Sequence, residues 1–336
     1  MDIVICDRPN VLRRARRDRP SRAAGQVLLR IRRVGVCGTD YHIFRGTQPY
    51  LSYPRVMGHE LAAEVVEIDA GSDLRIGQNV AVLPYLCCGA CVACRRGKSN
   101  CCARLSVLGV HVDGGMVEWL AVDEAFAVPA DGLDPDQTAM VEFLAIGLHA
   151  VRRGAVATGQ QVLVAGAGPI GMAVGLFCAA IGAKVTVLDG NAARARFCVE
   201  RLGCAAMETP DGAVADRLAA RTGNDFFDVV FDATGNADAM RTGFAYVAHG
   251  GTYVLLSIVG ASITFDDPEF HKREMTLLGS RNATRADFVD VIDAIRAGKV
   301  PTAALHTHGA SLNDLPDVFA SWMDPAANVI KAIVTV

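Results

Sequence analysis

The sequence predicts two domains, an irregular β-rich domain and a doubly wound α/β domain inserted into it. The chain has 336 residues, whereas a single hydrophobic core rarely grows beyond about 250–300 residues. Short β-branched runs separated by Gly, Pro and Asp fill residues 26–126, and from about residue 155 apolar runs alternate with helix-like segments. The chain after about residue 282 is too short for a third domain, so we expect it to return to the first.

In the first domain, the β-branched runs predict short strands at 26–36, 62–68, 78–86 and 106–112. In the second, nearly continuous apolar runs fit strands buried on both faces of a parallel sheet, at 161–166, 184–189, 228–234, 251–257 and 274–279, with a weaker sixth at 204–209. Helices are expected between them at 171–182, 193–203, 213–222 and 237–248. The last part of the chain predicts a helix at 286–298 and a strand at 329–336.

Composition excludes several classes of protein. Apolar residues make up 51% and the net charge is -3, which gives no electrostatic footprint for nucleic acid or an anionic membrane. The one basic run, Arg13 to Arg22, is typical of a solvated strand edge and loop. With no visible secretory signal and no apolar run of about 18 residues, we expect a cytoplasmic protein without a membrane span. Disulfides are rare there, so clustered cysteines indicate metal or redox chemistry.

A dinucleotide site is predicted in the motif GAGPIG. Gly166, Gly168 and Gly171 have G-x-G-x-x-G spacing between an expected strand and an expected helix, with Pro169 and Ile170 inside the motif. The first glycine permits a tight turn, the second lets the backbone approach a pyrophosphate, and the third lets the helix lie close to its strand. Helix N-terminal amides then face the phosphates.

Asp189, at the end of the next expected strand, favours NAD over NADP. A carboxylate at this place accepts hydrogen bonds from the adenosine ribose and repels a 2′-phosphate. Gly190 and Asn191 follow, with no adjacent Arg or Lys to hold such a phosphate.

Six of the eleven cysteines lie within residues 87–102. Cys88, Cys91, Cys94 and Cys102 have the spacing C-x2-C-x2-C-x7-C, and four thiolates suit a closed, structural Zn²⁺ site. Arg95, Arg96 and Lys98 are candidates to offset the thiolate charge. Cys87 and Cys101 each adjoin a proposed ligand, so a slipped ligand set stays an alternative.

A second, dispersed group of side chains suits a catalytic zinc with an open coordination position. It comprises Cys37, Thr39, Asp40 and His42 in GVCGTDYH, His59 and Glu60 in GHE, and Glu142 in MVEFLAIGLHA. The spacing alone does not single out the ligands.

Together these motifs resemble the zinc-containing medium-chain dehydrogenase family over essentially the whole chain. The resemblance implies a GroES-like catalytic domain at 1–148 and 284–336, a Rossmann NAD domain at 149–283, and two zinc ions. It makes Cys37 and His59 ligands of the catalytic zinc, with either Glu60 or Glu142 as the carboxylate ligand. Asp40 would orient His59. Thr39 would hydrogen-bond the alcohol oxygen, and His42 would relay its proton to solvent.

The same resemblance assigns further cofactor contacts. Arg194 would contact the adenosine, and the nicotinamide side would be lined by Thr234, by the turn from Ser257 to Gly260, and by Ser280, Arg281 and Asn282. One position departs from the family, since Phe143 stands where a proline usually follows the carboxylate at Glu142.

The segments TQPYLSYPRVMGHE, SVLGVHVDGG and DPEFHKREMTLLGSRNAT resemble the branch of L-galactonate 5-dehydrogenase and related sugar-acid and polyol oxidoreductases. Candidate substrate contacts are Arg281 and Arg45 for a carboxylate, and Gln48, Tyr50 and His111 for hydroxyls. The expected partner is a small-molecule alcohol, with a homodimer or homotetramer implied by the resemblance. Polyol or L-threonine dehydrogenation and a non-catalytic NAD-binding protein stay as alternatives; a zinc-free reductase would lack the zinc ligands.

Overall fold

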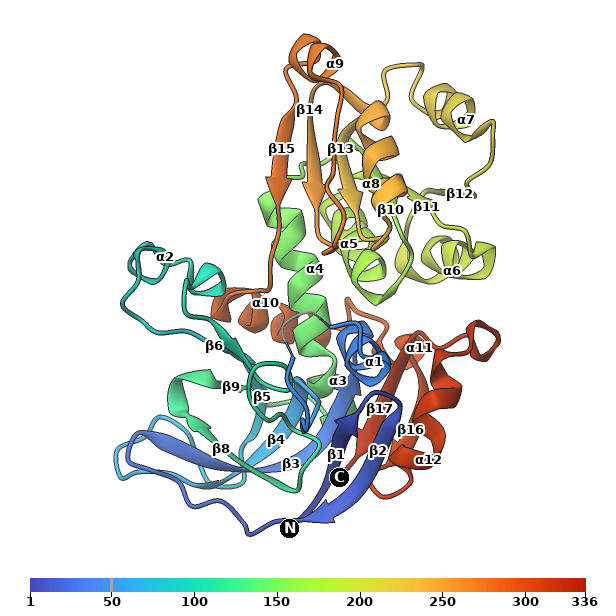
Figure 1. Ribbon diagram of the computed structural model, residues 1–336. Coiled ribbons are helices and arrows are strands. Elements are labelled where there is room, and N and C mark those ends of the chain that lie inside the picture. The colour runs from blue at the N-terminus through green and yellow to red at the C-terminus, as the bar shows by residue number, and fades with distance from the viewer. Residues whose placement is uncertain (49–50) are drawn as a thin grey trace. The chain divides into compact units, whose positions relative to one another are not determined.

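The computed structural model describes residues 1–48 and 51–336 (Figure 1). The chain forms two compact units. The first comprises Met1–Ala145 and Ala283–Val336, and the second comprises Ile146–Asn282. None of the helices among the described residues is long and apolar enough to cross a membrane.

The first unit is built on a seven-stranded sheet with the order β16-β17-β3-β4-β5-β9, in which β8 also pairs with β3. Its strands are β3 (Gln26–Val36), β4 (Glu60–Glu67), β5 (Asn79–Val82), β8 (Trp119–Asp123), β9 (Ala127–Pro129), β16 (His306–Ser311) and β17 (Lys331–Thr335). The long central strand β3 is mostly buried, as its apolar sequence predicts. The pairing of β17 with β3 brings the end of the chain into this sheet.

Two further strand pairs flank this sheet, β1 (Asp2–Arg8) with β2 (Val11–Arg16) and β6 (Tyr85–Leu86) with β7 (Ser106–Val107). The strand expected at 106–112 was therefore wrong beyond its first two residues. Backbone amides of Val110 and His111 turn back to the carbonyl of Val107 instead, and Gly109 adopts a φ of 75°, which favours glycine.

The basic run at the N-terminus is neutralised within the unit. Six of its arginines form ion pairs with carboxylates: Arg13 with Asp7, Arg14 with Asp317, Arg16 with Asp2, Arg17 with Asp113, Arg19 with Glu67, and Arg22 with Asp69. Arg19 also lies over the Trp119 ring, 4.1 Å from its centroid. The run joins the β1–β2 hairpin to neighbouring segments.

The helices of the first unit are α1 (Gly38–Arg45), α2 (Val92–Arg95), α3 (Pro135–Ala139), the start of α4 (Val141–Arg153), α10 (Arg285–Arg296), α11 (Thr302–Leu305) and α12 (Leu315–Val318), with the 3₁₀ helices η1 (Ser99–Cys101), η2 (Glu124–Phe126), η4 (Phe319–Met323) and η5 (Pro325–Ala327). Among these helices, α1, α3 and α10 begin at capping boxes. Helix α1 begins after Cys37 with Asp40 bonded back to the Cys37 amide, and it ends at Gly46 with a φ of 78°. These signals fix the direction in which the chain leaves Cys37.

The second unit is a doubly wound domain with a six-stranded parallel sheet in the order β12-β11-β10-β13-β14-β15 (Figure 1). Its strands are β10 (Gln161–Ala165), β11 (Lys184–Leu188), β12 (Ala206–Glu208), β13 (Phe227–Asp232), β14 (Val247–Leu255) and β15 (Thr276–Gly279). Because β10 is paired with both β11 and β13, the strand order reverses beside it, the place where ligands bind in such sheets.

The remaining helices of the second unit are α5 (Pro169–Ile181), α6 (Ala192–Leu202), α7 (Val214–Arg221), α8 (Ala237–Gly243), α9 (Asp267–Lys272) and the 3₁₀ helix η3 (Phe244–Tyr246). Helix α5 packs on β10, β11 and β13, and α8 packs on β13 and β14. The helix expected at 237–248 was too long. Its last part becomes η3 and then β14, because Phe244 and Tyr246 enter the buried cluster around Tyr253.

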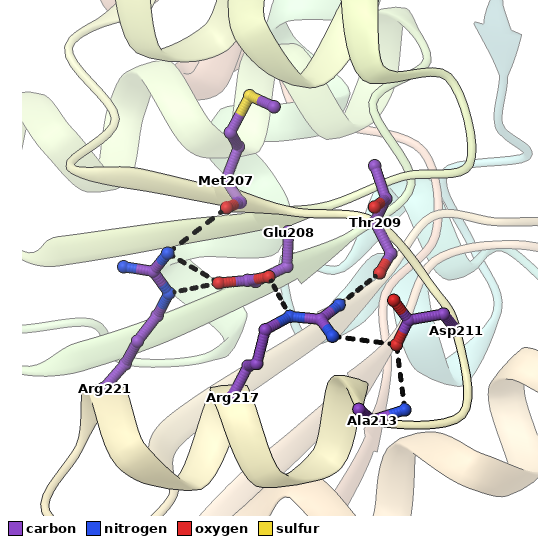
Figure 2. Close-up of polar contacts among 7 residues, drawn as sticks. All are labelled: Met207, Glu208, Thr209, Asp211, Ala213, Arg217 and Arg221. Atoms are coloured by element: carbon purple, nitrogen blue, oxygen red, sulfur yellow. Dashed lines mark hydrogen bonds and ion pairs between the residues drawn. The ribbon is translucent and has the colours of Figure 1, made fainter.

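An ion-pair network fixes the end of the edge strand β12 to α7 (Figure 2). Arg217 donates to Glu208 at 2.7 Å, to the Thr209 carbonyl at 2.9 Å and to Asp211 at 2.8 Å. Arg221 holds the other oxygen of Glu208 at 2.6 Å. The edge strand, which has few residues of its own, gains its position from these side chains.

Candidate active site and metal centres

Cys88, Cys91, Cys94 and Cys102 converge on one point of the first unit, with their sulfur atoms within 4.8 Å of one another. Individual sulfur pairs are 3.5 to 3.9 Å apart. Four thiolates at a Zn–S distance of about 2.3 Å in a tetrahedron would lie about 3.8 Å apart, so the donor set fits zinc. Cys87 and Cys101 are outside this group, and none of the eleven cysteines forms a disulfide.

Arg104, which the sequence did not single out, contacts the thiolates of this site. The Arg104 guanidinium donates to Cys88 Sγ at 3.4 Å, and its amide donates to Cys102 Sγ at 3.3 Å. Backbone amides, first that of Ala90, and the Arg104 guanidinium lower the pKa of Cys88 to about 5. Arg95 instead donates to a backbone carbonyl.

A second set of ligand atoms comes from the junctions of β3 with α1 and of a loop with β4. Cys37, His59 and Glu60 have ligand atoms within 4.8 Å of one another. His59 and Glu60 are buried and Cys37 is half-buried. A thiolate, an imidazole and a carboxylate suit Zn²⁺ and leave one position open.

Asp40 holds the backbone around these side chains. Its carboxylate accepts hydrogen bonds from the Cys37 amide at 2.9 Å and the Gly58 amide at 3.2 Å. His59 Nδ1 is 3.9 Å from Asp40 Oδ1, beyond hydrogen-bond reach, and has no hydrogen-bond partner among the described residues. Burial lowers the pKa of His59, but the neighbouring Asp40 and Cys37 raise it by more than burial lowers it. The pKa of His59 therefore lies well above its ordinary value.

The two candidate carboxylates have different surroundings. Both oxygens of Glu60 accept from Lys331 Nζ at 2.7 Å. Glu142 accepts from the Tyr85 hydroxyl with Oε1, whereas its buried Oε2 has no partner among the described residues. Burial raises the pKa of Glu142 to about 7. Only Glu60 belongs to the set with Cys37 and His59.

The predicted proton relay lies on α1. Thr39 and His42 are three residues apart on this helix, a spacing that places side chains on one face. Thr39 is half-buried and His42 is exposed. His42 Nδ1 is 2.9 Å from Thr47 Oγ1, which leaves Nε2 for another partner.

The glycine motif in the second unit has the form that a pyrophosphate needs. A Cβ on Gly166 would lie 2.7 Å from Ala233, and one on Gly171 would lie 1.8 Å from the Gly166 carbonyl oxygen. A Cβ on Gly168, by contrast, would meet nothing within 4 Å. Pro169 and Ile170 begin α5 directly after Gly168, so the open space adjoins a helix N-terminus.

Asp189 follows β11 and is linked to the same turn. Its carboxylate accepts from the Ala167 amide inside the motif and from the Asn191 amide at 2.6 Å. Asn191 caps α6, accepting from the amide of Arg194 at 3.2 Å. Of the two predicted adenosine residues, Asp189 therefore lies directly after β11 and Arg194 lies in the first turn of α6.

The residues expected on the nicotinamide side also form connected turns. Thr234 donates through its hydroxyl to Asp232 at 2.8 Å, and Ser257 accepts from the Gly235 amide at 3.0 Å. Ser280 is buried at the end of β15, whereas Arg281 is exposed and Asn282 has a φ of 54°.

The predicted substrate residues are spread over α1, the segment after it and the turn that follows β7. Arg45 is exposed at the end of α1, and Gln48 is half-buried. His111 Nδ1 accepts from the Val107 amide at 3.1 Å, a contact that stabilises its own turn. Tyr50 lies outside the described residues.

Sequence reasoning missed two buried functional candidates, Lys331 and Tyr85, which contact the two carboxylates. A single lysine inside the apolar run VIKAIVTV was the available signal for Lys331, because charged side chains are almost never fully buried without a partner. No comparable signal marked Tyr85.

Comparison with known proteins agrees with both units. Residues 23–132 match the alcohol dehydrogenase GroES-like domain, and residues 169–297 match the zinc-binding dehydrogenase model. L-Galactonate-5-dehydrogenase of Escherichia coli K12 is 41% identical over 336 residues, which cover 100% of this chain and 99% of that protein. The 2-dehydro-3-deoxy-L-galactonate 5-dehydrogenase of Pseudoalteromonas atlantica is 31% identical over 314 residues, or 93% of this chain and 92% of the relative.

A solved structure is similar over the whole chain. The alcohol dehydrogenase RspB from E. coli CFT073, complexed with NADH, superposes with a TM-score of 0.93 at 26% identity and covers 100% of this chain and 99% of its own. The chain belongs to the zinc-containing medium-chain dehydrogenase family. It is an NAD-dependent zinc alcohol dehydrogenase that combines a GroES-like fold with a Rossmann fold, and it acts on a small-molecule alcohol.

Proposed function

We propose that this dehydrogenase oxidises the C5 hydroxyl of a sugar acid of the L-galactonate type to a ketone. The observation that carries the chemistry is the convergence of Cys37, His59 and Glu60 ligand atoms within 4.8 Å. The substrate class is supported by the two sugar-acid dehydrogenases that match 92% or more of their own length.

In this proposal Cys37, His59 and Glu60 hold the catalytic zinc, and Glu142 is the second carboxylate available to it, through its Oε2, which has no partner among the described residues. A zinc ion bound there would supply a Lewis acid for the alcohol oxygen, and a bound NAD would supply the hydride acceptor. Cys88, Cys91, Cys94 and Cys102 hold the structural zinc. Asp40 keeps the Cys37 and Gly58 amides in place, so the ligand-bearing turns are fixed before substrate binds.

Proton removal is assigned to α1. Thr39 accepts the hydrogen bond of the substrate hydroxyl, and the exposed His42 delivers the proton to solvent. Thr47 holds Nδ1 of His42 and so leaves Nε2 for the proton.

The cofactor contacts are assigned to the second unit. Gly166, Gly168 and Gly171 would hold the pyrophosphate, and Asp189 would accept hydrogen bonds from the adenosine ribose. The other proposed contacts are Pro169, Ile170, Arg194, Thr234, Ser257, Ser280, Arg281 and Asn282. We assign residues 149–283 to the NAD domain and 1–148 with 284–336 to the catalytic domain.

We further propose a cytoplasmic homo-oligomer, a dimer or tetramer. The four-thiolate site suits a reducing compartment. The edge strand β15 carries the exposed Leu277, and an uncovered strand edge is a template for pairing with a second copy. Light scattering of the purified protein measures this state, and a monomer would contradict it.

The test of the function is NADH formation with purified enzyme and a panel of alcohols. The panel contains L-galactonate, L-gulonate, other aldonates, galactitol, sorbitol, L-threonine and simple alcohols. A kcat/KM for an aldonate at least about tenfold above those of the polyols supports the proposal, a difference of about 1.4 kcal/mol in transition-state binding. A preference for a polyol or L-threonine contradicts the sugar-acid substrate. Absence of turnover with the whole panel contradicts the proposed reaction.

A further inference from the structure

The first unit contains a buried cation that the reaction described above does not use. Lys331 is 1% exposed on β17, and it is the only lysine or arginine that is buried in the described part of the chain. Such a group requires partners for its charge and for its three N–H donors. Its partners show what it does.

Lys331 contacts all three segments that carry candidate ligands of the catalytic metal. Two donors go to the oxygens of Glu60 at 2.7 Å. The third goes to the carbonyl of Val36, the residue before Cys37, at 3.2 Å. The ammonium also lies 4.3 Å from the ring centroid of Phe143, the residue after Glu142.

The chain makes room for this arrangement. Gly35 is paired with Glu60 across β3 and β4, and a Cβ on Gly35 would lie 2.1 Å from Glu60 Oε2. Phe143, which occupies the position of the family's usual proline, is 1% exposed. Its ring face can hold a cation by cation–π attraction, which proline cannot do. Gly35 thus leaves room for the Glu60 carboxylate, and Phe143 provides a ring face for the Lys331 ammonium that binds this carboxylate.

We propose that Lys331, held against Phe143, is a positioning residue that restrains Glu60 from full engagement with the catalytic metal. The ammonium and the metal ion compete for the same carboxylate, and they repel each other. Glu60 therefore binds the metal less tightly than a free carboxylate would, and a coordination position stays accessible to the substrate. This inference rests on the proposed assignment of Cys37, His59 and Glu60 to the catalytic zinc.

The test compares Lys331→Gln with Phe143→Leu. The side-chain amide introduced by K331Q can still donate a hydrogen bond to Glu60 but carries no charge, so it removes the competing cation. F143L keeps an apolar side chain and removes the ring face. F288L is the matched control, because Phe288 is a fully buried ring of the same unit on α10. Each purified variant is assayed for zinc content, for zinc release to a chelator, and for kcat and KM.

We expect release of the catalytic zinc from K331Q to be about tenfold slower and kcat to fall about tenfold, with KM for NAD unchanged. In F143L, zinc release should be about threefold slower and kcat about threefold lower. F288L should change neither zinc release nor kcat. In the cobalt-substituted enzyme, the visible spectrum of K331Q should differ from that of the unsubstituted chain, because the carboxylate engages the metal more closely.

Faster or unchanged zinc release in K331Q would overturn the inference, since a merely structural role would weaken zinc binding or leave it alone. If K331Q does not fold, F143L provides the test, and faster or unchanged zinc release from F143L would overturn the inference. An unsubstituted chain that binds two zincs and turns over, with variants that leave release and kcat unchanged, refutes the inference alone. An unsubstituted chain that lacks the second zinc refutes the proposed site as well.

Discussion

Lys331 Nζ lies 2.7 Å from both carboxylate oxygens of Glu60, and the two side chains are 1% and 0% exposed. This pair joins β17, near the end of the chain, to the first residue of β4. Burial lowers the pKa of Lys331, but Glu60 and Cys37 raise it by more than burial lowers it. The pKa of Lys331 is therefore above its ordinary value, and the lysine stays charged.

The first prediction concerns this pair in the zinc-free protein. Lys331→Met should lower the free energy of unfolding by about 3–5 kcal/mol, because it leaves a buried carboxylate without its cation. Replacing both members, as Lys331→Met with Glu60→Leu, should recover most of that loss because no unpaired charge remains. Urea unfolding of the three chains measures this. A single variant as stable as the unsubstituted chain contradicts the pairing.

The catalytic metal is tested by His59→Ala. Removing one of three protein ligands should release the catalytic zinc and lower kcat by at least about 10³-fold, since the substrate oxygen loses its Lewis acid. Metal analysis should find one zinc per chain, retained by the four cysteines. Normal turnover by a His59→Ala chain that holds one zinc would refute the assignment.

The four-cysteine site is tested by Cys91→Ser, with Cys101→Ser as the matched control. Cys91 belongs to the converged set, whereas Cys101 is exposed and outside it. Cys91→Ser should lose the structural zinc and lower the yield of folded or assembled protein, while the surviving enzyme keeps its KM. Cys101→Ser should retain two zincs. Loss of zinc from Cys101→Ser instead would indicate the slipped ligand set.

Cofactor preference is tested by Asp189→Asn. Loss of the negative charge removes the repulsion of a 2′-phosphate and weakens the ribose acceptor. The ratio of kcat/KM for NAD to that for NADP should fall at least about tenfold. Asp216→Asn, an exposed carboxylate on α7, serves as the control and should leave the ratio unchanged. An unchanged ratio in Asp189→Asn contradicts the ribose contact.

The network at Glu208 predicts a pH dependence of stability (Figure 2). Burial raises the pKa of Glu208, but Arg217 and Arg221 lower it by more than burial raises it. The pKa of Glu208 therefore lies below its ordinary value. A carboxylate with a lowered pKa stabilises the fold above its unfolded pKa of about 4.3, and that contribution is lost as the pH falls through the folded value.

Arg217→Gln should therefore lower the urea midpoint at pH 7, and the difference from the unsubstituted chain should narrow below about pH 4. Arg201→Gln, at an exposed position of α6, is the control and should have little effect at either pH. A difference that is independent of pH would show that the arginine acts through packing rather than charge.

Much of the second unit follows from local pattern. All six expected strands are present, because strands buried on both faces are continuous apolar runs that the sequence displays directly. The open space at Gly168 and the crowding at Gly166 and Gly171 agree with the roles that the spacing predicted. The end of the α8 region was misjudged because tertiary burial of Phe244 and Tyr246 outweighs helical periodicity there.

The first unit was harder to predict, because its site depends on contacts between distant segments. The N-terminal hairpin and strands β8, β9 and β16 are short and lack a strong alternating pattern. Lys331 reaches Glu60 only because β17 and β4 both pair with β3. The contact of Arg104 with Cys88 was missed for a similar reason, because a turn that the spacing does not reveal brings Arg104 back to Cys88.

The central claim is most directly tested with L-galactonate that carries deuterium at C5. If the enzyme oxidises the C5 hydroxyl by hydride transfer, the deuterium should appear at C4 of the nicotinamide in the reduced cofactor, and the product should be the 5-keto acid without deuterium at that carbon. Mass spectrometry of both products measures this transfer. Deuterium that stays in the sugar acid, or that is lost to water, would contradict the proposed reaction.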